Sequence, residues 1–304
     1  MFEIIVRSLV WLLQKFPLSI VQGMGKFWGG IAYRLASKGR RTALANLQLA
    51  FGDNLTRKDR DRIARKSFEN LLITAFEICW AKNLPREIES FIDPLNKQAC
   101  LDAYAEGKGV LLLVPHMGNW EVCARWLTKN IPVVHAVVRK QKEPWIQAML
   151  ERFRKDSGLR VIDNRNSLRR VLAALRRGEL VILMIDQHMR KGAVKVDFFG
   201  HPAMTTASAA LLAIKTGCQV LVGACYRKSG GGWGCEFSDP LETVVTDDRD
   251  RDYITNTQRY VSIMEERVRE HPEDWMWMHR RWRTGRQREP IRPNIDEMEL
   301  VHRD

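Results

Sequence analysis

The sequence has few cysteines, and none of them forms a pattern typical of metal binding or of a disulfide framework. Its six cysteines among 304 residues include no Cys-x-x-Cys pair and no tight group with histidine. Zinc ribbons and disulfide-stapled folds are therefore not predicted, and reduced thiols in a cytoplasmic compartment are expected. The chain also has no internal repeat and no low-complexity tract, which argues against repeat architectures and extended disorder.

Long hydrophobic runs are missing from the N-terminal region, although hydrophobic side chains are frequent there. Its longest uncharged run, residues 16–25, has ten residues, whereas a membrane-spanning helix needs roughly 18 or more. No small-residue cleavage site follows a clean apolar run, so a signal peptide is not predicted. Residues 1–50 carry seven basic residues and one acid among many Trp, Phe, Leu and Ile. This pattern favours helices that lie in a membrane interface; a buried pair of N-terminal helices is the alternative.

Positive charge is in excess over the whole chain. The sequence contains 49 Lys and Arg against 36 Asp and Glu, a net charge of +13, and residues 138–177 alone hold twelve basic residues against four acids. Such a chain is expected to bind phosphate groups or acidic proteins. A nucleic-acid-binding module would explain this charge together with the ten Trp. It would not explain the apolar N-terminal residues, and no RNA- or DNA-binding signature is present. No nucleic-acid partner is therefore predicted.

From residue 110 onward, short apolar runs alternate with helical patterns. Strands are expected at residues 110–115, 132–138, 159–163, 180–186 and 218–226, with 233–237 beside the last. Helices are expected at residues 57–90, 120–129, 143–156, 167–177 and 204–216. Regular alternation predicts an α/β fold with a mostly parallel central sheet flanked by helices. We expect residues 1–50 to form a membrane-associating helical segment and residues 51–304 to form the catalytic domain.

The sequence HMGNWE follows the first buried strand and contains a histidine and an acid five residues apart, His116 and Glu121. In open α/β sheets, ligands bind beyond the carboxyl ends of the strands. A histidine oriented by a carboxylate acts as a general base. We therefore expect Glu121 to fold back beside His116. The backbone N–H groups of residues 117–120 are expected to stabilise an oxyanion.

A second polar cluster, Asp186 and His188, follows the strand predicted at 180–186. Either side chain can face the same crevice as His116. The next segment contains Phe198-Phe199-Gly200 and a helix rich in small residues around 207–210. Two interpretations apply to it: a space for an acyl chain, or a hairpin and helix packed closely on the sheet.

Five blocks of the sequence resemble the bacterial lipid A late acyltransferases, the lauroyl/myristoyl acyltransferase family. They are RRTALANLQLAF (40–51), VPHMGNWE (114–121), ERFRKDSG (151–158) after the Arg139 segment, IDQHMRKGAVKVDFFGHPAMT (185–205) and PEDWMWMHRRWRT (272–284). The blocks occur in the family's order and cover nearly the whole chain. One departure is that the family often has a cleaner N-terminal transmembrane helix than residues 1–35 provide.

This resemblance implies transfer of a fatty acyl group from acyl carrier protein to a hydroxyl of a phosphorylated glycolipid, at the cytoplasmic face of the inner membrane. It implies His116 and Glu121 as the catalytic pair, with the second-block arginine at Arg152 or Arg154. Asp186 corresponds to the acid after the next strand. Arg139, Arg152 and Arg154 are expected to bind acceptor phosphates, and Asp186 is expected to belong with them to the residues that bind the acceptor or the oxyanion. Neither a metal nor a cofactor is expected. The alternative is the same chemistry on a lysophospholipid, glycerophosphate or another glycolipid.

Overall fold

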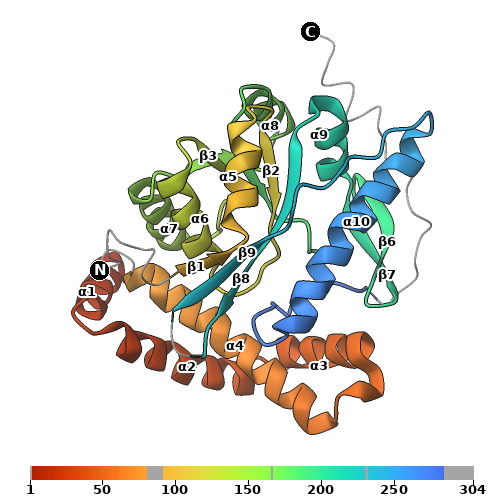
Figure 1. The fold of residues 1–304 in the computed structure, drawn as a ribbon. Helices are drawn as coiled ribbons and strands as arrows, with labels where there is room; N and C mark the ends of the chain where they lie inside the picture. Colours follow the sequence, from red (N-terminus) through yellow and green to blue (C-terminus); the bar gives the residue numbers. More distant parts are fainter. Residues whose placement is uncertain (1, 81–91, 166, 230–231, 284–304) are drawn as a thin grey trace.

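The structure is a computed structural model that describes residues 2–80, 92–165, 167–229 and 232–283 (Figure 1). In chain order, the described elements are α1 (Phe2–Leu13), α2 (Leu18–Leu35), α3 (Ser37–Phe51), the short helix η1 (Gly52–Asn54), α4 (Arg57–Trp80), β1 (Ile92–Leu95), α5 (Lys97–Ala105), β2 (Val110–Leu113), α6 (Trp120–Asn130), β3 (Val134–Val138), α7 (Pro144–Asp156), β4 (Arg160–Asp163), α8 (Ser167–Arg176), β5 (Leu180–Leu183), β6 (Ala193–Phe198), β7 (His201–Thr206), α9 (Ser208–Thr216), β8 (Gln219–Arg227), β9 (Trp233–Phe237) and α10 (Arg249–Glu270).

The central sheet has seven strands within the described residues, in the order β1-β9-β8-β2-β5-β3-β4. The five adjoining strands β8, β2, β5, β3 and β4 run parallel to one another. At the other edge, β9 is antiparallel to β8 and parallel to β1. Strands β6 and β7 form a separate antiparallel hairpin. The predicted mostly parallel sheet with flanking helices is therefore confirmed.

Both faces of the sheet are buried, which explains why its central strands are continuously apolar. Alternate side chains of β2 point to opposite faces: Leu111 and Leu113 join a core with α8, α9 and α10, whereas Val110 and Leu112 join a core with α5, α6 and α7. In Figure 1, α6 and α7 lie on one side of the sheet and α9 and α10 on the other. The carboxyl ends of β2 and β5 are thus held side by side in a rigid scaffold.

Several element boundaries differ from the sequence-based expectation. The helix expected at 204–216 begins only at Ser208, because residues 201–206 pair with 193–198 in the hairpin. Helix α4 ends at Trp80, and residues 81–90 of the helix expected at 57–90 lie outside the described residues. Strand β1 and helices α5 and α10 were not predicted. Strand β1 contains Pro94, which is tolerated because β1 is an edge strand.

The N-terminal helices form a layer along one end of the sheet, with α2 lying against α4 (Figure 1). The two helices approach very closely at Gly25 and Gly29. A Cβ atom at Gly25 would lie 2.6 Å from the Cα atom of Ile73, and one at Gly29 would lie 2.4 Å from the Cα atom of Glu69. Glycine at these positions therefore lets the α2 backbone rest directly on α4.

The outer surface of α1 and α2 is rich in exposed apolar side chains. Trp11, Phe27 and Trp28 expose 61%, 64% and 49% of their surfaces, and Leu9, Leu12, Ile20 and Leu35 are exposed as well. We call these seven residues the apolar face. No helix in the described part of the chain is both long enough and apolar enough to cross a bilayer. Helix α3 packs in the same core as the sheet through Ala43 and Leu47. The division of the chain at residue 50 stays a prediction.

Candidate active site

The site is built at the carboxyl ends of two neighbouring parallel strands. Leu113 at the end of β2 is in register with Leu183 at the end of β5. His116 and Asp186 each follow these residues by three positions, so the sheet places them at the same height beyond its edge. This pairing depends on β2 and β5 being adjacent, which strand spacing in the sequence does not reveal.

His116 and Asp186 are joined by two hydrogen bonds. The Nδ1 atom of His116 lies 2.7 Å from Oδ1 of Asp186, and the backbone N–H of His116 donates to Oδ2 at 2.8 Å. The indole Nε1–H of Trp275 also donates to Oδ2, at 2.9 Å. With Nδ1 directed at a carboxylate, the neutral imidazole carries its proton on Nδ1 and its lone pair on Nε2. Nε2 is then the atom that can accept a proton.

Asp186 remains ionised in spite of its burial, since only 3% of its surface is exposed. Burial alone would raise the pKa of Asp186, but the charge of His116 and the hydrogen bonds from His116 and Trp275 outweigh it and lower this pKa to about 2. A carboxylate in this position can stabilise an imidazolium at His116. Asp186 orients His116, which corrects the expectation that it binds acceptor or oxyanion.

Glu121 does not make the expected contact with the His116 ring. It lies in the first turn of α6, and its carboxylate faces Arg154 of α7 instead. Arg154 Nε is 3.2 Å from both Glu121 oxygens, and Arg154 Nη2 also donates to Oε1. Both side chains are buried. The expectation that Glu121 orients His116 is therefore wrong, because the position of Asp186 beyond β5 satisfies Nδ1 instead.

The three predicted arginines have different environments. Arg139 is exposed and lines the cavity next to His116. Arg154 also lines that cavity, but its charge is paired with Glu121. Arg152 has 77% of its side chain exposed, lies 3.9 Å from Asp156 on the same helix and is not among the residues that line the cavity. Arg154 is therefore the second-block arginine that reaches the site, and Arg152 is not.

A cavity of about 1280 Å³ opens beside His116. One wall is apolar and comes from α4 and α7: Leu71, Ala75, Ile78, Met149 and Leu150. Polar side chains on another part of the wall include His188 and His279 and the exposed arginines Arg139, Arg169 and Arg283. Burial lowers the pKa of His188 and of His279, which disfavours their charged forms. The positive charge of this wall therefore comes from the arginines.

The backbone of the turn at residues 116–119, which we call the catalytic turn, is engaged with the protein. The N–H of Met117 donates to the carbonyl of Pro115 at 2.8 Å, and that of Gly118 donates to the carbonyl of Asp274 at 3.0 Å. These two groups are not available to an oxyanion, contrary to expectation. Oxyanion stabilisation by the N–H groups of Asn119 and Trp120 stays a prediction.

Most of the small residues near the hairpin are packed in the core rather than around an empty space. Ala207, Ala209 and Ala210 are buried in the core, with 3%, 0% and 0% exposed. This arrangement agrees with the second interpretation, a hairpin and a helix packed on the sheet. From this segment only Thr206, Ser208 and Leu212 line the cavity.

The C-terminal block at 272–284 contributes site residues that reasoning from individual residues did not identify. Trp275 binds Asp186, and His279 and Arg283 line the cavity. The block is held by the side chain of Asn46 in α3, which donates to the carbonyls of Trp277 and His279 at 2.9 and 2.7 Å. The only sequence signal for these roles is the resemblance of the two blocks to family signatures.

Several known acyltransferases are similar in sequence to this chain. The family model for bacterial lipid A biosynthesis acyltransferases matches residues 2–284. A phosphatidylinositol mannoside acyltransferase from Mycobacterium tuberculosis is 28% identical over 206 residues; the match covers 66% of this chain and 62% of that protein, less than two thirds of its length. The lipid A biosynthesis lauroyltransferase of Escherichia coli K12 is 25% identical over 289 residues, covering 94% of this chain and 92% of that protein.

Among solved structures, a 1-acyl-sn-glycerophosphate (LPA) acyltransferase from Thermotoga maritima aligns with a TM-score of 0.39 and 11% identity. The alignment covers 83% of this chain and 96% of that chain. The family match, by contrast, extends over all five sequence blocks and every site residue described above. The chain belongs to the bacterial lipid A biosynthesis acyltransferase family.

Proposed function

We propose that this protein transfers a fatty acyl group from an acyl carrier protein thioester to a hydroxyl group of a phosphorylated glycolipid, a lipid A precursor in lipopolysaccharide synthesis. The observation that carries the proposal is the hydrogen-bonded pair of His116 and Asp186 at a cavity with an apolar wall and exposed arginines. An acylation site for such substrates needs these features: a base, room for hydrocarbon and cations for phosphate.

In the proposed mechanism, Nε2 of His116 takes the proton of the acceptor hydroxyl. The hydroxyl oxygen attacks the thioester carbonyl and forms a tetrahedral intermediate. The carbon–sulfur bond then breaks, and the leaving thiolate takes the proton back from the imidazolium. Asp186 stabilises the imidazolium between the two proton transfers. General-base catalysis of this kind contributes about 10²–10⁴-fold to the rate.

Arg139, Arg169 and Arg283 are the side chains that we assign to the phosphate groups of the acceptor. All three are exposed and line the cavity, and a guanidinium group binds phosphate through paired hydrogen bonds. Arg154 is not assigned to phosphate because Glu121 already neutralises it. The apolar wall formed by α4 and α7 is assigned to the acyl chain.

The donor and the membrane location are part of the same proposal. The net charge of +13 suits both an acidic carrier protein and an anionic membrane surface. The apolar face of α1 and α2 is proposed to lie in the cytoplasmic leaflet of the inner membrane, with its aromatic side chains at the interface. The acceptor would then be reached from the lipid surface.

A second candidate acceptor is a mannosylated phosphoinositide. It is favoured by the similarity to the Mycobacterium tuberculosis protein, which is named for that acceptor. The chemistry at His116 would be the same, and only the headgroup bound by the arginines would differ.

The test is an acyl-transfer assay with detergent-solubilised protein and a panel of acyl carrier protein thioesters, read by mass spectrometry. The acceptors are a tetraacylated lipid A precursor with and without its sugar acids, a phosphatidylinositol mannoside and a lysophospholipid. We expect product on the lipid A precursor, and its loss in His116→Ala. His201→Ala, which changes an exposed histidine of the hairpin, is the matched control. Full activity of His116→Ala would contradict the mechanism, and product on another acceptor alone would contradict the lipid A assignment.

A further inference from the structure

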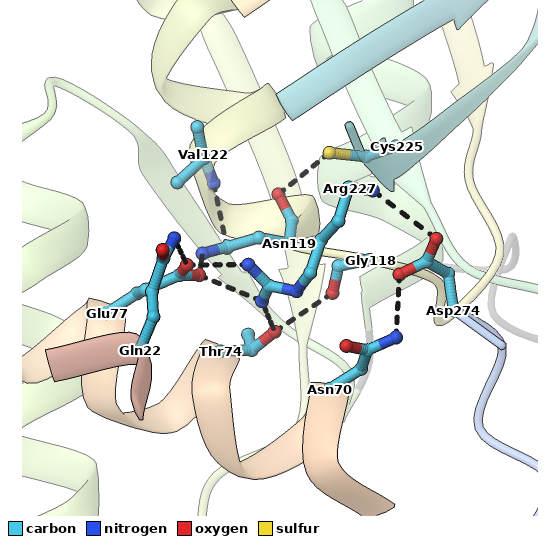
Figure 2. A network of polar contacts seen from close by, with 10 residues as sticks. All are labelled: Gln22, Asn70, Thr74, Glu77, Gly118, Asn119, Val122, Cys225, Arg227 and Asp274. Carbon is cyan, nitrogen blue, oxygen red and sulfur yellow. Dashed lines mark hydrogen bonds and ion pairs between the residues drawn. The ribbon is translucent and has the colours of Figure 1, made fainter. Parts of the chain in front are cut away.

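A buried ion pair is linked by hydrogen bonds to the catalytic turn. Arg227 at the end of β8 directs its guanidinium group at the carboxylate of Glu77 in α4 (Figure 2). Arg227 Nη1 donates to Glu77 Oε1 at 2.5 Å, and Nη2 donates to Oε2 at 2.9 Å. Only 3% of the Glu77 side chain and 15% of the Arg227 side chain are exposed. The pair is therefore a bidentate, largely buried ion pair.

Two hydrogen-bond routes connect this pair to the catalytic turn (Figure 2). In the first, Asn119 Nδ2 donates to Glu77 Oε2 at 2.7 Å. In the second, Arg227 Nη2 donates to Thr74 Oγ1 at 2.8 Å, and Thr74 Oγ1 donates to the carbonyl of Gly118 at 3.1 Å. Glu77 is thus connected to Asn119, and Arg227 is connected through Thr74 to Gly118, the residue before it.

One of these two residues, Asn119, directly precedes helix α6. The Oδ1 atom of Asn119 accepts from the N–H of Val122 at 3.2 Å and caps the helix. The Nδ2 atom of the same amide is the donor to the Glu77 carboxylate. Trp120 and Glu121, in the first turn of α6, line the cavity. The Asn119 side chain, which caps this turn, therefore helps to position both residues.

A buried ion pair is a poor way to gain stability, since apolar residues of similar volume are often equally stabilising. Its advantage is geometric specificity, because the paired hydrogen bonds between a guanidinium group and a carboxylate fix the relative orientation of the two side chains. We infer that Glu77 and Arg227 are positioning residues that hold the catalytic turn, and through it the His116 imidazole, at the cavity. The inference rests on the proposed role of His116 as the base.

The test removes the pair without leaving an unpaired buried charge, in the double variant Glu77→Leu/Arg227→Met. The matched control is Arg65→Met/Glu69→Leu, which removes another Arg–Glu pair of α4 that does not contact the turn. We expect kcat of the first variant to fall by about 10²-fold, the effect of misplacing a catalytic group by an ångström. The KM values should change by less than about threefold, because the arginines assigned to the acceptor phosphates lie on other segments than those the pair holds. The control should keep its kcat.

Hydrogen exchange measured by mass spectrometry gives a readout that does not depend on activity. Amide exchange in the peptide containing residues 116–122 should become at least about tenfold faster in Glu77→Leu/Arg227→Met, while peptides from β3, β4 and α8 stay unchanged. Unchanged exchange at 116–122, or an equal loss of kcat in the control, would overturn the inference. If the unmodified protein transfers no acyl group to any acceptor, the proposed function fails, and the exchange result alone still decides whether the pair holds the turn.

Discussion

The carboxylate of Asp186 binds His116 through both of its oxygens, one at the imidazole Nδ1 and one at the backbone N–H. The same side chain therefore fixes the ring and the main chain from which the ring projects. Asp186→Asn should lower kcat by about 10²–10⁴-fold, because the amide can present the wrong hydrogen-bonding group to Nδ1 and cannot stabilise an imidazolium.

Acyl transfer under saturating substrate checks this prediction. Asp197→Asn, which changes an exposed aspartate of β6, serves as its control. A value of kcat within twofold of the unmodified protein for Asp186→Asn would show that His116 does not depend on this carboxylate.

Replacing Gly118 and Gly200 by alanine separates two contributions to the loss of unfolding free energy: a steric clash and a left-handed backbone conformation. Gly118 has φ +58° and Gly200 has φ +72°. A Cβ atom at Gly118 would lie 2.2 Å from the carbonyl oxygen of Cys225, whereas nothing lies within 4 Å at Gly200. Gly200→Ala should cost about 1–2 kcal/mol of unfolding free energy, the cost of a left-handed alanine. Gly118→Ala should cost more and abolish acyl transfer.

Urea unfolding of both glycine variants, followed by circular dichroism, measures the difference. Equal losses of unfolding free energy would mean that the catalytic turn moves away from Cys225 at no cost.

Arg154 and Arg152 should respond very differently to the same substitution. Arg154→Met leaves Glu121 buried without its cation and should cost about 3–5 kcal/mol of unfolding free energy. Arg152→Met removes an exposed side chain and should change that free energy by less than about 0.5 kcal/mol. Thermal or urea unfolding compares the two, and similar values would contradict the assignment of Arg154 as the buried partner of Glu121.

Substitution on the apolar face should weaken membrane binding without changing the fold. Burial of a large apolar side chain contributes about 1.5–3 kcal/mol. Phe27→Ser/Trp28→Ser should therefore reduce binding to vesicles of anionic phospholipid by at least about tenfold. Val245→Ser, which changes an exposed apolar residue outside α1 and α2, should bind as the unmodified protein does. Sedimentation with vesicles measures both variants, and unchanged binding of the double variant would exclude this face as the contact.

Asp274 should make the protein less stable as the pH rises towards neutrality. Its pKa is raised from 3.8 to about 6, mainly by burial. The backbone N–H and the charge of Arg227 lower this pKa, Glu273 raises it, and Lys66 lowers it. Because the folded state holds this proton more tightly, the stabilisation is complete below about pH 4 and is lost as the pH rises through 6. Asp274→Asn removes the charge at every pH.

The unfolding free energy of the unmodified protein should therefore fall relative to that of Asp274→Asn between pH 4 and pH 7.5, by at most about 3 kcal/mol. Urea unfolding at a series of pH values tests this. Parallel curves for the two proteins would show that Asp274 does not titrate in this range.

The sequence predicts the scaffold of this protein better than the pairing within its site. The apolar runs around Leu112 and Leu221 indicate strands because both faces of the sheet are buried there. Strand β1 has no such run. Helix α10 buries polar residues such as Asn256 and Thr257 among its apolar ones, which obscures its apolar pattern in the sequence. Boundaries near His201 depend on pairing between two strands, which a single helical pattern does not contain.

The partner of His116 illustrates the same limit. The spacing of His116 and Glu121 is compatible with a contact between them, but a residue in the first helical turn can also face a neighbouring helix, and Glu121 faces Arg154. Asp186 is distant in the sequence and becomes adjacent only because β2 and β5 are neighbours. Glu77 and Arg227, and likewise Trp275 and Asp186, meet through tertiary packing alone.

The close approach of α2 and α4 at Gly25 and Gly29 has a consequence for how deep the enzyme would sit in a lipid surface. Helix α2 carries much of the apolar face, and α4 carries Leu71 and Ala75 into the cavity wall. Because the two backbones are in contact, the apolar face and the cavity keep the same relative position. Any change in the depth or tilt of the apolar face in the membrane therefore moves the cavity by the same amount. Under the proposed membrane contact, the height of His116 above the bilayer is thereby fixed, and an acceptor can present its headgroup at that height while its tails stay in the lipid.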